Sequence, residues 1–256
     1  MKEFGPVESL IKKKASHHHT ICAALIDPED FTPKAAAEVA VSCIKAGASL
    51  ILVGGSTIAN QSQLDRIVRS IKSHVVSPKS QRKTPVVLFP GNITGVSRFA
   101  DAILFSSLLN STNTYYIIGA QALGAMEVFK SGLESIPMGY LVFGNTSSTS
   151  FIGQVNGLPA TRPSLAVIYA LAARYLGMRA LYLEAGSGSS DPLPPATVHA
   201  VRKFYDGILI VGGGITTAEH ARKIAESGAD VLVIGNLLQT RGFEDALKRI
   251  VAAIKR

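Results

Sequence analysis

The chain has 256 residues, no tryptophan, only two cysteines and few charged side chains. Hydrophobic residues make up 47% of it, so it can bury a large core, which excludes an intrinsically disordered protein. Cys22 and Cys43 lack CxxC spacing, and we expect them to be reduced thiols in the core. No apolar run approaches the ~20 residues that span a bilayer, and no secretory signal is apparent. These absences predict a soluble, cytoplasmic protein.

The charge balance is basic, with 26 Lys and Arg against 18 Asp and Glu and a net charge of +8. The basic residues are scattered, apart from the short cluster at residues 12–14. Because there is no arginine-rich tract or zinc-finger pattern, we expect no nucleic-acid partner. A basic surplus suits phosphorylated substrates or peripheral contact with an anionic membrane surface.

Short β-branched apolar runs alternate with helical patterns along the chain. Eight runs are expected to form strands, at residues 21–26, 49–53, 86–89, 102–105, 139–143, 180–183, 208–211 and 231–234. Helical patterns lie between most of them, at 33–46, 61–75, 117–131, 162–176, 195–204, 218–227 and 243–254. Near-continuous hydrophobic strands are typical of parallel sheets covered on both faces. Eight such repeats predict an α/β fold, a single TIM (β/α)8 barrel over residues 1–256.

Two segments depart from a regular barrel. Only residues 93–101 separate the third predicted strand and its Pro-Gly-Asn end from the fourth strand. A full crossover helix needs ~10–12 residues, so the third helix is missing or reduced to a turn. Taken alone, this favours a trimmed barrel with a loop in the gap; the alternative is a slot through which a long hydrocarbon reaches the barrel wall. Residues 144–163 form a polar, aperiodic stretch that could serve as a lid.

The loops after strands six, seven and eight are rich in glycine. They contain Tyr-Leu-Glu-Ala-Gly-Ser-Gly-Ser at 182–189, Val-Gly-Gly-Gly-Ile-Thr at 211–216 and Ile-Gly-Asn at 234–236. TIM barrels often bind phosphate at these positions, because glycine lets backbone N–H groups approach an anion. The three loops together predict a phosphate site. The alternative is a set of tight turns that merely require positive φ.

Two carboxylates are candidates for chemistry. Asp27 directly follows the first strand, and Ser56 follows the second strand beside it. A carboxylate beside a hydroxyl suits Mg²⁺, which keeps several waters and takes substrate phosphates as ligands. Glu184 shares one face of strand six with Tyr182. Beside a bound phosphate ester, Glu184 could act as a general base for a substrate hydroxyl, whereas a salt bridge to a neighbouring strand is the structural alternative.

With these residues in place, the chain resembles the geranylgeranylglyceryl phosphate synthase family, to which the bacterial heptaprenylglyceryl phosphate synthases are related. The resemblance runs from the first strand to the C-terminus. It rests on the motifs at 25–28, 53–57, 88–92, 105–111, 177–188, 211–215 and 235–236. It implies a Mg²⁺-dependent prenyltransferase that joins sn-glycerol 1-phosphate to a C20 prenyl diphosphate through an ether bond. It also implies that the isoprenoid runs along the groove left by the missing helix.

The resemblance also assigns roles to individual residues. Asp27 and Ser56 would hold Mg²⁺, and Glu184 with Tyr182 would act in catalysis. Glycerol phosphate would be bound by Tyr182, Leu183, Glu184, Ala185, Gly186, Ser187, Gly188, Gly213, Gly214, Gly235 and Asn236. The stretch 157–163 departs from the family pattern, which leaves the contacts of the lid open.

Three alternatives to this function remain at the level of the sequence. One is the same reaction with another prenyl chain length. Another is a phosphate-handling isomerase or cyclase of amino-acid biosynthesis, which commonly needs a second carboxylate after strand five; that strand here is followed by Gly-Asn-Thr at 144–146. The third is a carrier that binds a phosphorylated lipid without reaction. We also expect a homo-oligomer, because the predicted helix at 164–176 has an apolar outer face.

Overall fold

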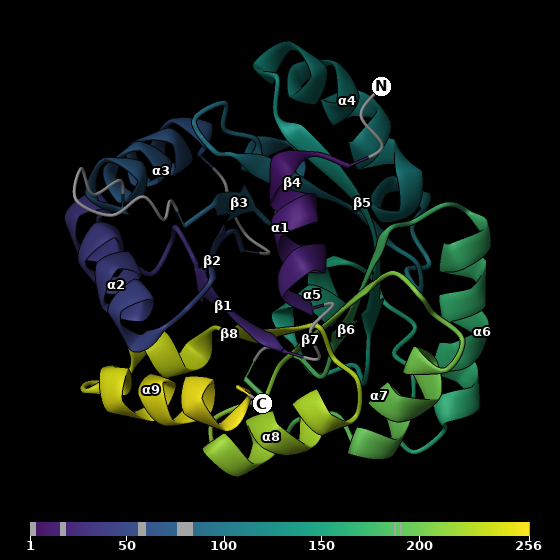
Figure 1. Ribbon diagram of the computed structural model, residues 1–256. Coiled ribbons are helices and arrows are strands. Elements are labelled where there is room, and N and C mark those ends of the chain that lie inside the picture. Colours follow the sequence, from purple (N-terminus) through teal and green to yellow (C-terminus); the bar gives the residue numbers. More distant parts are fainter. Residues whose placement is uncertain are drawn as a thin grey trace.

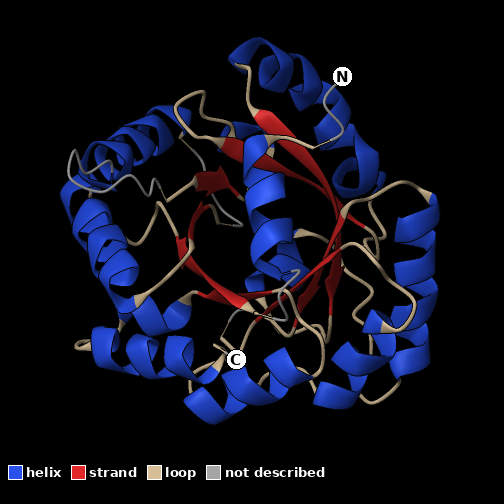
Figure 2. Ribbon diagram, viewed as in Figure 1, coloured by secondary structure: helices blue, strands red, loops and turns tan. Residues whose placement is uncertain are grey.

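The computed structural model describes residues 4–15, 19–55, 60–75, 84–186, 188–189 and 191–255. Eight parallel strands form a closed barrel in chain order, surrounded by helices (Figures 1 and 2). The strands are β1 Ile21–Ile26, β2 Leu50–Val53, β3 Val86–Leu88, β4 Ala102–Leu108, β5 Glu134–Val142, β6 Ala180–Glu184, β7 Ile208–Gly212 and β8 Val231–Ile234. The predicted TIM barrel is thus confirmed.

The helices lie between the strands. They are α1 Pro6–Ala15, α2 Pro33–Ala46, α3 Gln61–Val75, η1 Ile93–Gly95, η2 Tyr115–Gly119, α4 Ala120–Ser131, α5 Ser148–Ile152, α6 Pro163–Tyr175, α7 Pro195–Arg202, α8 Ala218–Glu226, η3 Asn236–Gln239 and α9 Phe243–Ala253. Most predicted helices are found within two residues of their expected ends; the pattern at 117–131 is divided between a π-helical turn, η2, and α4. None of the described helices has both the length and the apolar character that crossing a membrane requires.

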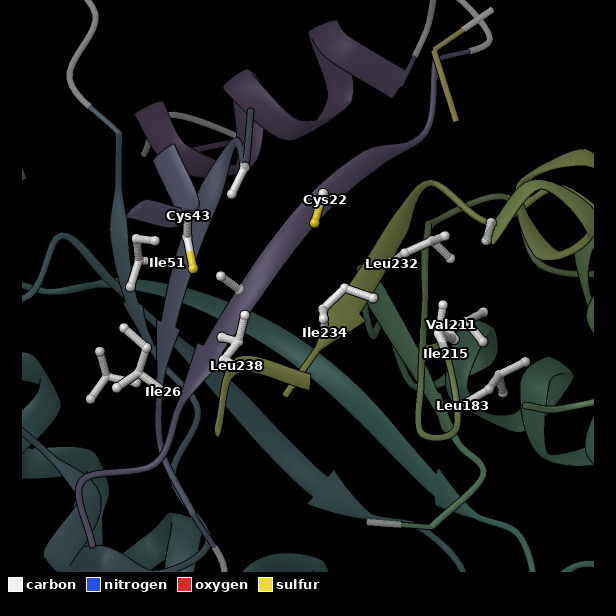
Figure 3. Packing of buried hydrophobic residues seen from close by; sticks show 14 of the residues in the cluster. Cys22, Ile26, Cys43, Ile51, Leu183, Val211, Ile215, Leu232, Ile234 and Leu238 are labelled. Carbon is white, nitrogen blue, oxygen red and sulfur yellow. The ribbon is translucent and has the colours of Figure 1, made fainter. Parts of the chain in front are cut away.

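Strand residues alternate between two apolar layers, one inside the barrel and one between the barrel and its helices. The inner layer contains residues such as Ala23, Leu52 and Ile210, and the outer layer contains their neighbours along each strand. Figure 3 shows Cys22 and Cys43 among aliphatic side chains of the outer layer. Burial raises the pKa of both thiols to about 12, so they are neutral packing groups rather than nucleophiles.

Helix α1 closes the N-terminal end of the barrel, where it lies across the opening in Figure 1. Val7 belongs to the interior apolar cluster, and the carboxylate of Glu134 accepts hydrogen bonds from the N–H groups of Val7 and Glu8. The side chain of Glu8 is fully buried and pairs with Arg179 at 2.9 Å. A ligand therefore has to enter the barrel from the opposite end, where the βα loops lie.

The third βα unit lacks a full helix, as the length of its segment predicts. Between β3 and β4, residues 89–101 are all described and contain only the three-residue 3-10 helix η1. Gln61 at the start of α3 donates a hydrogen bond from Nε2 to Val96 O, which ties this segment to the preceding helix. On the other side of the gap stand η2 and α4.

Three segments differ from the prediction. Strand β4 runs to Leu108 rather than ending at residue 105. Strand β5 begins at Glu134 rather than at Gly139, because Pro137 and Gly139 interrupt its sequence pattern while its backbone still pairs with the whole of β4. The polar stretch after β5 contains the short helix α5, which begins with a capping box formed by Ser147 and Ser150. This stretch is folded against the barrel end, since Phe143 forms a bridge with Leu158.

Candidate active site

Two carboxylates stand at the open end of the barrel because of the period-two alternation of its strands. Leu25 and Tyr182 face the interior, so Asp27 and Glu184, each two residues further on, continue the same inward-facing rows. Both carboxylates line one cleft. The predicted shared face of Tyr182 and Glu184 is therefore found in the structure.

Glu184 lies deep in this cleft, with only 7% of its surface exposed. Its Oε1 accepts a hydrogen bond of 2.8 Å from the N–H of Gly186, and it also accepts one from the hydroxyl of Tyr182. Burial raises the pKa of Glu184 from 4.5 to about 6, and these two hydrogen bonds oppose the rise. No salt bridge to Glu184 occurs within the described part of the chain, so the alternative of a structural ion pair fails.

Three aromatic rings form the floor beside Glu184. Phe89, just after β3, stacks on Tyr182 with 5.1 Å between ring centroids and an interplanar angle of 23°. Tyr140 packs its edge against both, at 5.4 Å from Phe89 and 5.1 Å from Tyr182. Neither Phe89 nor Tyr140 was among the predicted site residues. The register of the barrel, which places Tyr140 opposite Tyr182, could have indicated the second of them.

The glycine loops after β6, β7 and β8 come together at the same end. Gly213 and Gly214 have φ values of +84° and +67°, and β-carbons there would collide with Glu184 and with the backbone of Asp191. Gly188 lies next to the side chain of Asn236 from the loop after β8. The predicted convergence of these loops is present, and Gly213, Gly214, Gly235 and Asn236 all line the cleft.

Asp27 carries the predicted metal site, and its surroundings fit Mg²⁺. The carboxylate is half-buried and lines the cleft, and its Oδ1 accepts a hydrogen bond of 3.0 Å from the N–H of Glu29. Burial raises the pKa of Asp27, and no cationic side chain among the described residues is seen to pair with it. Gly55 leaves room for it, since any β-carbon there would overlap the carboxylate. No cluster of three or more metal-binding side chains occurs among the described residues, and Mg²⁺ needs only one or two protein carboxylates.

The cleft continues from the barrel mouth into the gap left by the missing helix. Its volume is about 1510 Å³, including space open to solvent. Beyond the carboxylates its walls become apolar, with Val96, Ile103, Phe105 and Val128 among them. The cleft therefore reaches into this gap, as the slot interpretation expects, and Val96 and Ile103 are themselves buried in its wall, as the packed-loop interpretation expects. Thr149 from the predicted lid also borders the cleft.

The other predicted site residues are placed as follows. The side chains of Leu183 and Ala185 pack in the layer outside the barrel, so only their backbone could reach a ligand at the mouth. Gly186 contributes its N–H to Glu184 rather than to the cleft wall. Ser56 and Ser187 lie outside the described residues.

Comparison with known proteins identifies the family. The sequence profile of the PcrB family matches residues 12–254. The geranylgeranylglyceryl phosphate synthase of Cenarchaeum symbiosum (strain A) is 50% identical over 250 residues, covering 98% of each chain. That of Nitrosopumilus maritimus (strain SCM1) is 45% identical over 250 residues, covering 98% of this chain and 97% of its own. The chain belongs to the PcrB family. The resemblance drawn from its motifs is thereby confirmed.

Solved structures of PcrB-family relatives superpose closely on the chain. The (S)-3-O-geranylgeranylglyceryl phosphate synthase of Thermoplasma acidophilum, in complex with sn-glycerol-1-phosphate, has a TM-score of 0.91 and 35% identity over 98% of this chain and 99% of its own. The tryptophan synthase alpha chain of Legionella pneumophila has a TM-score of 0.58 at 17% identity. It shares the barrel fold alone.

Proposed function

We propose that this protein is a Mg²⁺-dependent prenyltransferase that converts sn-glycerol 1-phosphate and geranylgeranyl diphosphate into 3-O-geranylgeranyl-sn-glyceryl 1-phosphate and diphosphate. The observation that carries this proposal is one continuous cleft, in which glycine-rich loops and two carboxylates lead into an apolar slot. The names of its close relatives support the reaction, and the Thermoplasma acidophilum relative binds sn-glycerol-1-phosphate. The reaction would be the first ether-forming step of archaeal-type phospholipid synthesis.

The glycine loops would bind the glycerol phosphate. Positive φ at Gly213 and Gly214 turns the backbone sharply at the cleft, and Asn236, the first residue of the 3-10 helix η3, also lines the cleft. Backbone N–H groups in such turns bind phosphate without a charged side chain. Gly235 and Gly188 complete this wall, and Glu184 lies directly beneath it.

Glu184 would take the proton of the attacking hydroxyl. A general base must be ionised when substrate binds and must gain a proton readily as the new bond forms. A pKa of about 6 meets both needs near neutral pH. The hydroxyl of Tyr182 holds the carboxylate in place, and burial raises the pKa of Tyr182 well above 10, so this hydroxyl stays protonated as a hydrogen-bond donor.

Asp27 and Ser56 would hold Mg²⁺. When bound there, the ion would neutralise the negative charge of the diphosphate leaving group. The apolar residues of the slot would surround the hydrocarbon and exclude water, which would otherwise compete with the glycerol hydroxyl for the allylic carbon.

The test is incubation of the purified chain with Mg²⁺, sn-glycerol 1-phosphate and radiolabelled geranylgeranyl diphosphate. We expect a labelled phospholipid precursor and stoichiometric diphosphate, and loss of both when EDTA is added. Ligand binding without diphosphate release would identify a carrier instead. Failure to consume the prenyl diphosphate at all would favour an isomerase or cyclase. Against that alternative, the segment directly after β5, residues 143–146, contains no carboxylate. Parallel reactions with C10, C15 and C35 diphosphates would establish the preferred chain length.

Three accompanying proposals concern the protein's surroundings. Exposed Ile168, Tyr175 and Leu176 on α6 and just after it support a homo-oligomer, which analytical ultracentrifugation would detect. The net charge of +8 supports peripheral contact with anionic membranes, which liposome co-sedimentation would test. The two buried free thiols support a cytoplasmic location, which fractionation of the source cells would test.

A further inference from the structure

The three rings at the barrel mouth are more than packing groups, because of where they lie. Phe89, Tyr140 and Tyr182 come from three different strand ends and all line the cleft. The stacked pair and the two edge contacts join them into a single aromatic surface. In the layers below, aliphatic residues such as Leu52 and Val87 fill the barrel.

A series of contacts joins Asp27 to Glu184 by way of Phe89. On one side, Asp27 abuts Gly55, and the preceding residue, Gly54, fits against the backbone carbonyl of Phe89 so closely that a β-carbon would overlap it. On the other side, the ring of Phe89 stacks on Tyr182, whose hydroxyl bonds to Glu184. The leaving group would be held near Asp27 and the nucleophile near Glu184. Phe89 lines the same cleft as both carboxylates, so its ring is close to the path of a carbon that passes from one to the other.

The backbone of Phe89 is also held firmly. Its N–H donates a 2.9 Å hydrogen bond to the carbonyl of Val53 at the end of β2, and the close approach of Gly54 fixes the carbonyl side. The stack on Tyr182 then limits rotation of the ring. A preorganised group of this kind needs no rearrangement when charge develops beside it.

We propose that the ring of Phe89, supported by Tyr140 and Tyr182, stabilises the allylic cation during prenyl transfer. This inference rests on the proposed function. Aromatic faces carry negative potential, and a desolvated cation over such a face is bound substantially more tightly than over an aliphatic group. No basic side chain lines the cleft within the described residues, so none there repels a cation, and the packed rings offer it uncharged π faces.

The step balances without any further reactant. The bond between C1 of the prenyl chain and the diphosphate oxygen breaks, and its electron pair leaves with diphosphate. The resulting allylic cation lies over the Phe89 ring until a lone pair of the glycerol hydroxyl forms the new C–O bond. The hydroxyl proton passes to Glu184, and the aromatic ring is unchanged at the end.

The experiment replaces Phe89 with phenylalanines that carry one, two or three ring fluorines. Fluorine withdraws electron density from the ring face while shape and apolar contacts are nearly retained. We expect the single-turnover rate to fall in a graded manner, reaching about tenfold or more with three fluorines. The KM for glycerol phosphate should stay unchanged, because the phosphate loops are not altered. Phe89→Leu should lose about 10–30-fold in the same rate, and Phe89→Tyr should retain most of it.

Phe243 provides the matched control, because it is buried in the helix layer at the start of α9, away from the cleft. Fluorination there should leave the rate unchanged. The inference is overturned if the single-turnover rate does not change with fluorination at position 89, or if it falls equally at positions 89 and 243. In either case, ether formation by the wild type would leave the proposed function intact. If the wild type forms no ether product, the proposed function itself fails.

Discussion

Replacing Glu184 with glutamine should have opposite effects on stability and on turnover. The wild-type carboxylate is 7% exposed, and burial raises its pKa from 4.5 to about 6. A shift of about 1.5 units corresponds to roughly 2 kcal/mol of free energy by which ionisation of this group destabilises the fold at neutral pH. Glutamine keeps a carbonyl acceptor for the Gly186 N–H but carries no charge. At pH 7 the free energy of unfolding of Glu184→Gln should therefore be about 2 kcal/mol larger than that of the wild type. This corresponds to a melting temperature about 4–8 °C higher.

The pH dependence identifies the cause. Because the folded-state pKa of Glu184 is raised, the folded protein binds the proton more tightly than the unfolded chain does. The free energy of unfolding of the wild type should therefore decline as the pH rises from about 4.5 to about 6. Above that range the decline should be complete, at roughly 2 kcal/mol. The advantage of Glu184→Gln should be largest at pH 7–8 and should vanish below pH 4.5.

Urea denaturation across this pH range measures the effect, and a steady-state assay measures turnover. We expect glutamine to lower turnover by about 10²–10⁴-fold, the typical contribution of a general base, with little change in glycerol phosphate binding. Glu38→Gln, on the exposed surface of α2, is the control and should change neither quantity. A urea midpoint of unfolding for Glu184→Gln equal to that of the wild type at pH 7 would refute the predicted stabilisation. Turnover at the wild-type rate would refute the role of Glu184 as the base.

The remaining predictions concern the other parts of the cleft. Asp27→Ala should abolish turnover that depends on a divalent cation, and metal-dependent product from this variant would remove Asp27 from the scheme. Gly213→Ala should raise the KM for glycerol phosphate by tenfold or more, because φ of +84° and contact with Glu184 exclude a methyl group; an unchanged KM in a folded variant would count against the phosphate loop. The wild-type kcat/KM should fall below about pH 6 as Glu184 takes up its proton, and a flat profile from pH 5 to 8 would contradict its role as base. Gly124→Phe, in the slot wall, should lower activity with C20 more than with C10 prenyl diphosphate, whereas equal losses would show that the hydrocarbon takes another route.

Most of the barrel could be predicted from the sequence because its strands are nearly continuous apolar runs. Parallel strands covered on both faces require such runs, so the eight strands were recognisable without any alignment. The last three residues of β4 were missed, and strand β5 was the larger exception, since Pro137 and Gly139 weaken the local pattern. Its first half is held in place by pairing with β4, a tertiary effect that no window along the chain contains.

The site was predicted where a single strand end supplied the chemistry. Asp27 and the Tyr182–Glu184 pair could be predicted because each places a carboxylate at the end of a recognisable strand. The glycine loops indicated an anion site. The motif around Glu184 also led to Leu183, whose side chain the strand alternation directs outward. Phe89 could not be found from the sequence alone, because its role depends on the register that stacks it against Tyr182.

The missing third helix gives the protein an incomplete outer shell. In the other units, a helix packs against the apolar wall of the barrel, whereas here η1 is a single turn and the cleft, with Val96 and Ile103 among its lining residues, extends into the space beside it. A hydrocarbon chain in that space would cover the apolar outer face of β3 and β4, as a helix covers that of the other strands. The substrate tail would then be a component of the folded architecture, and its arrival would raise the melting temperature of the enzyme as well as start the reaction.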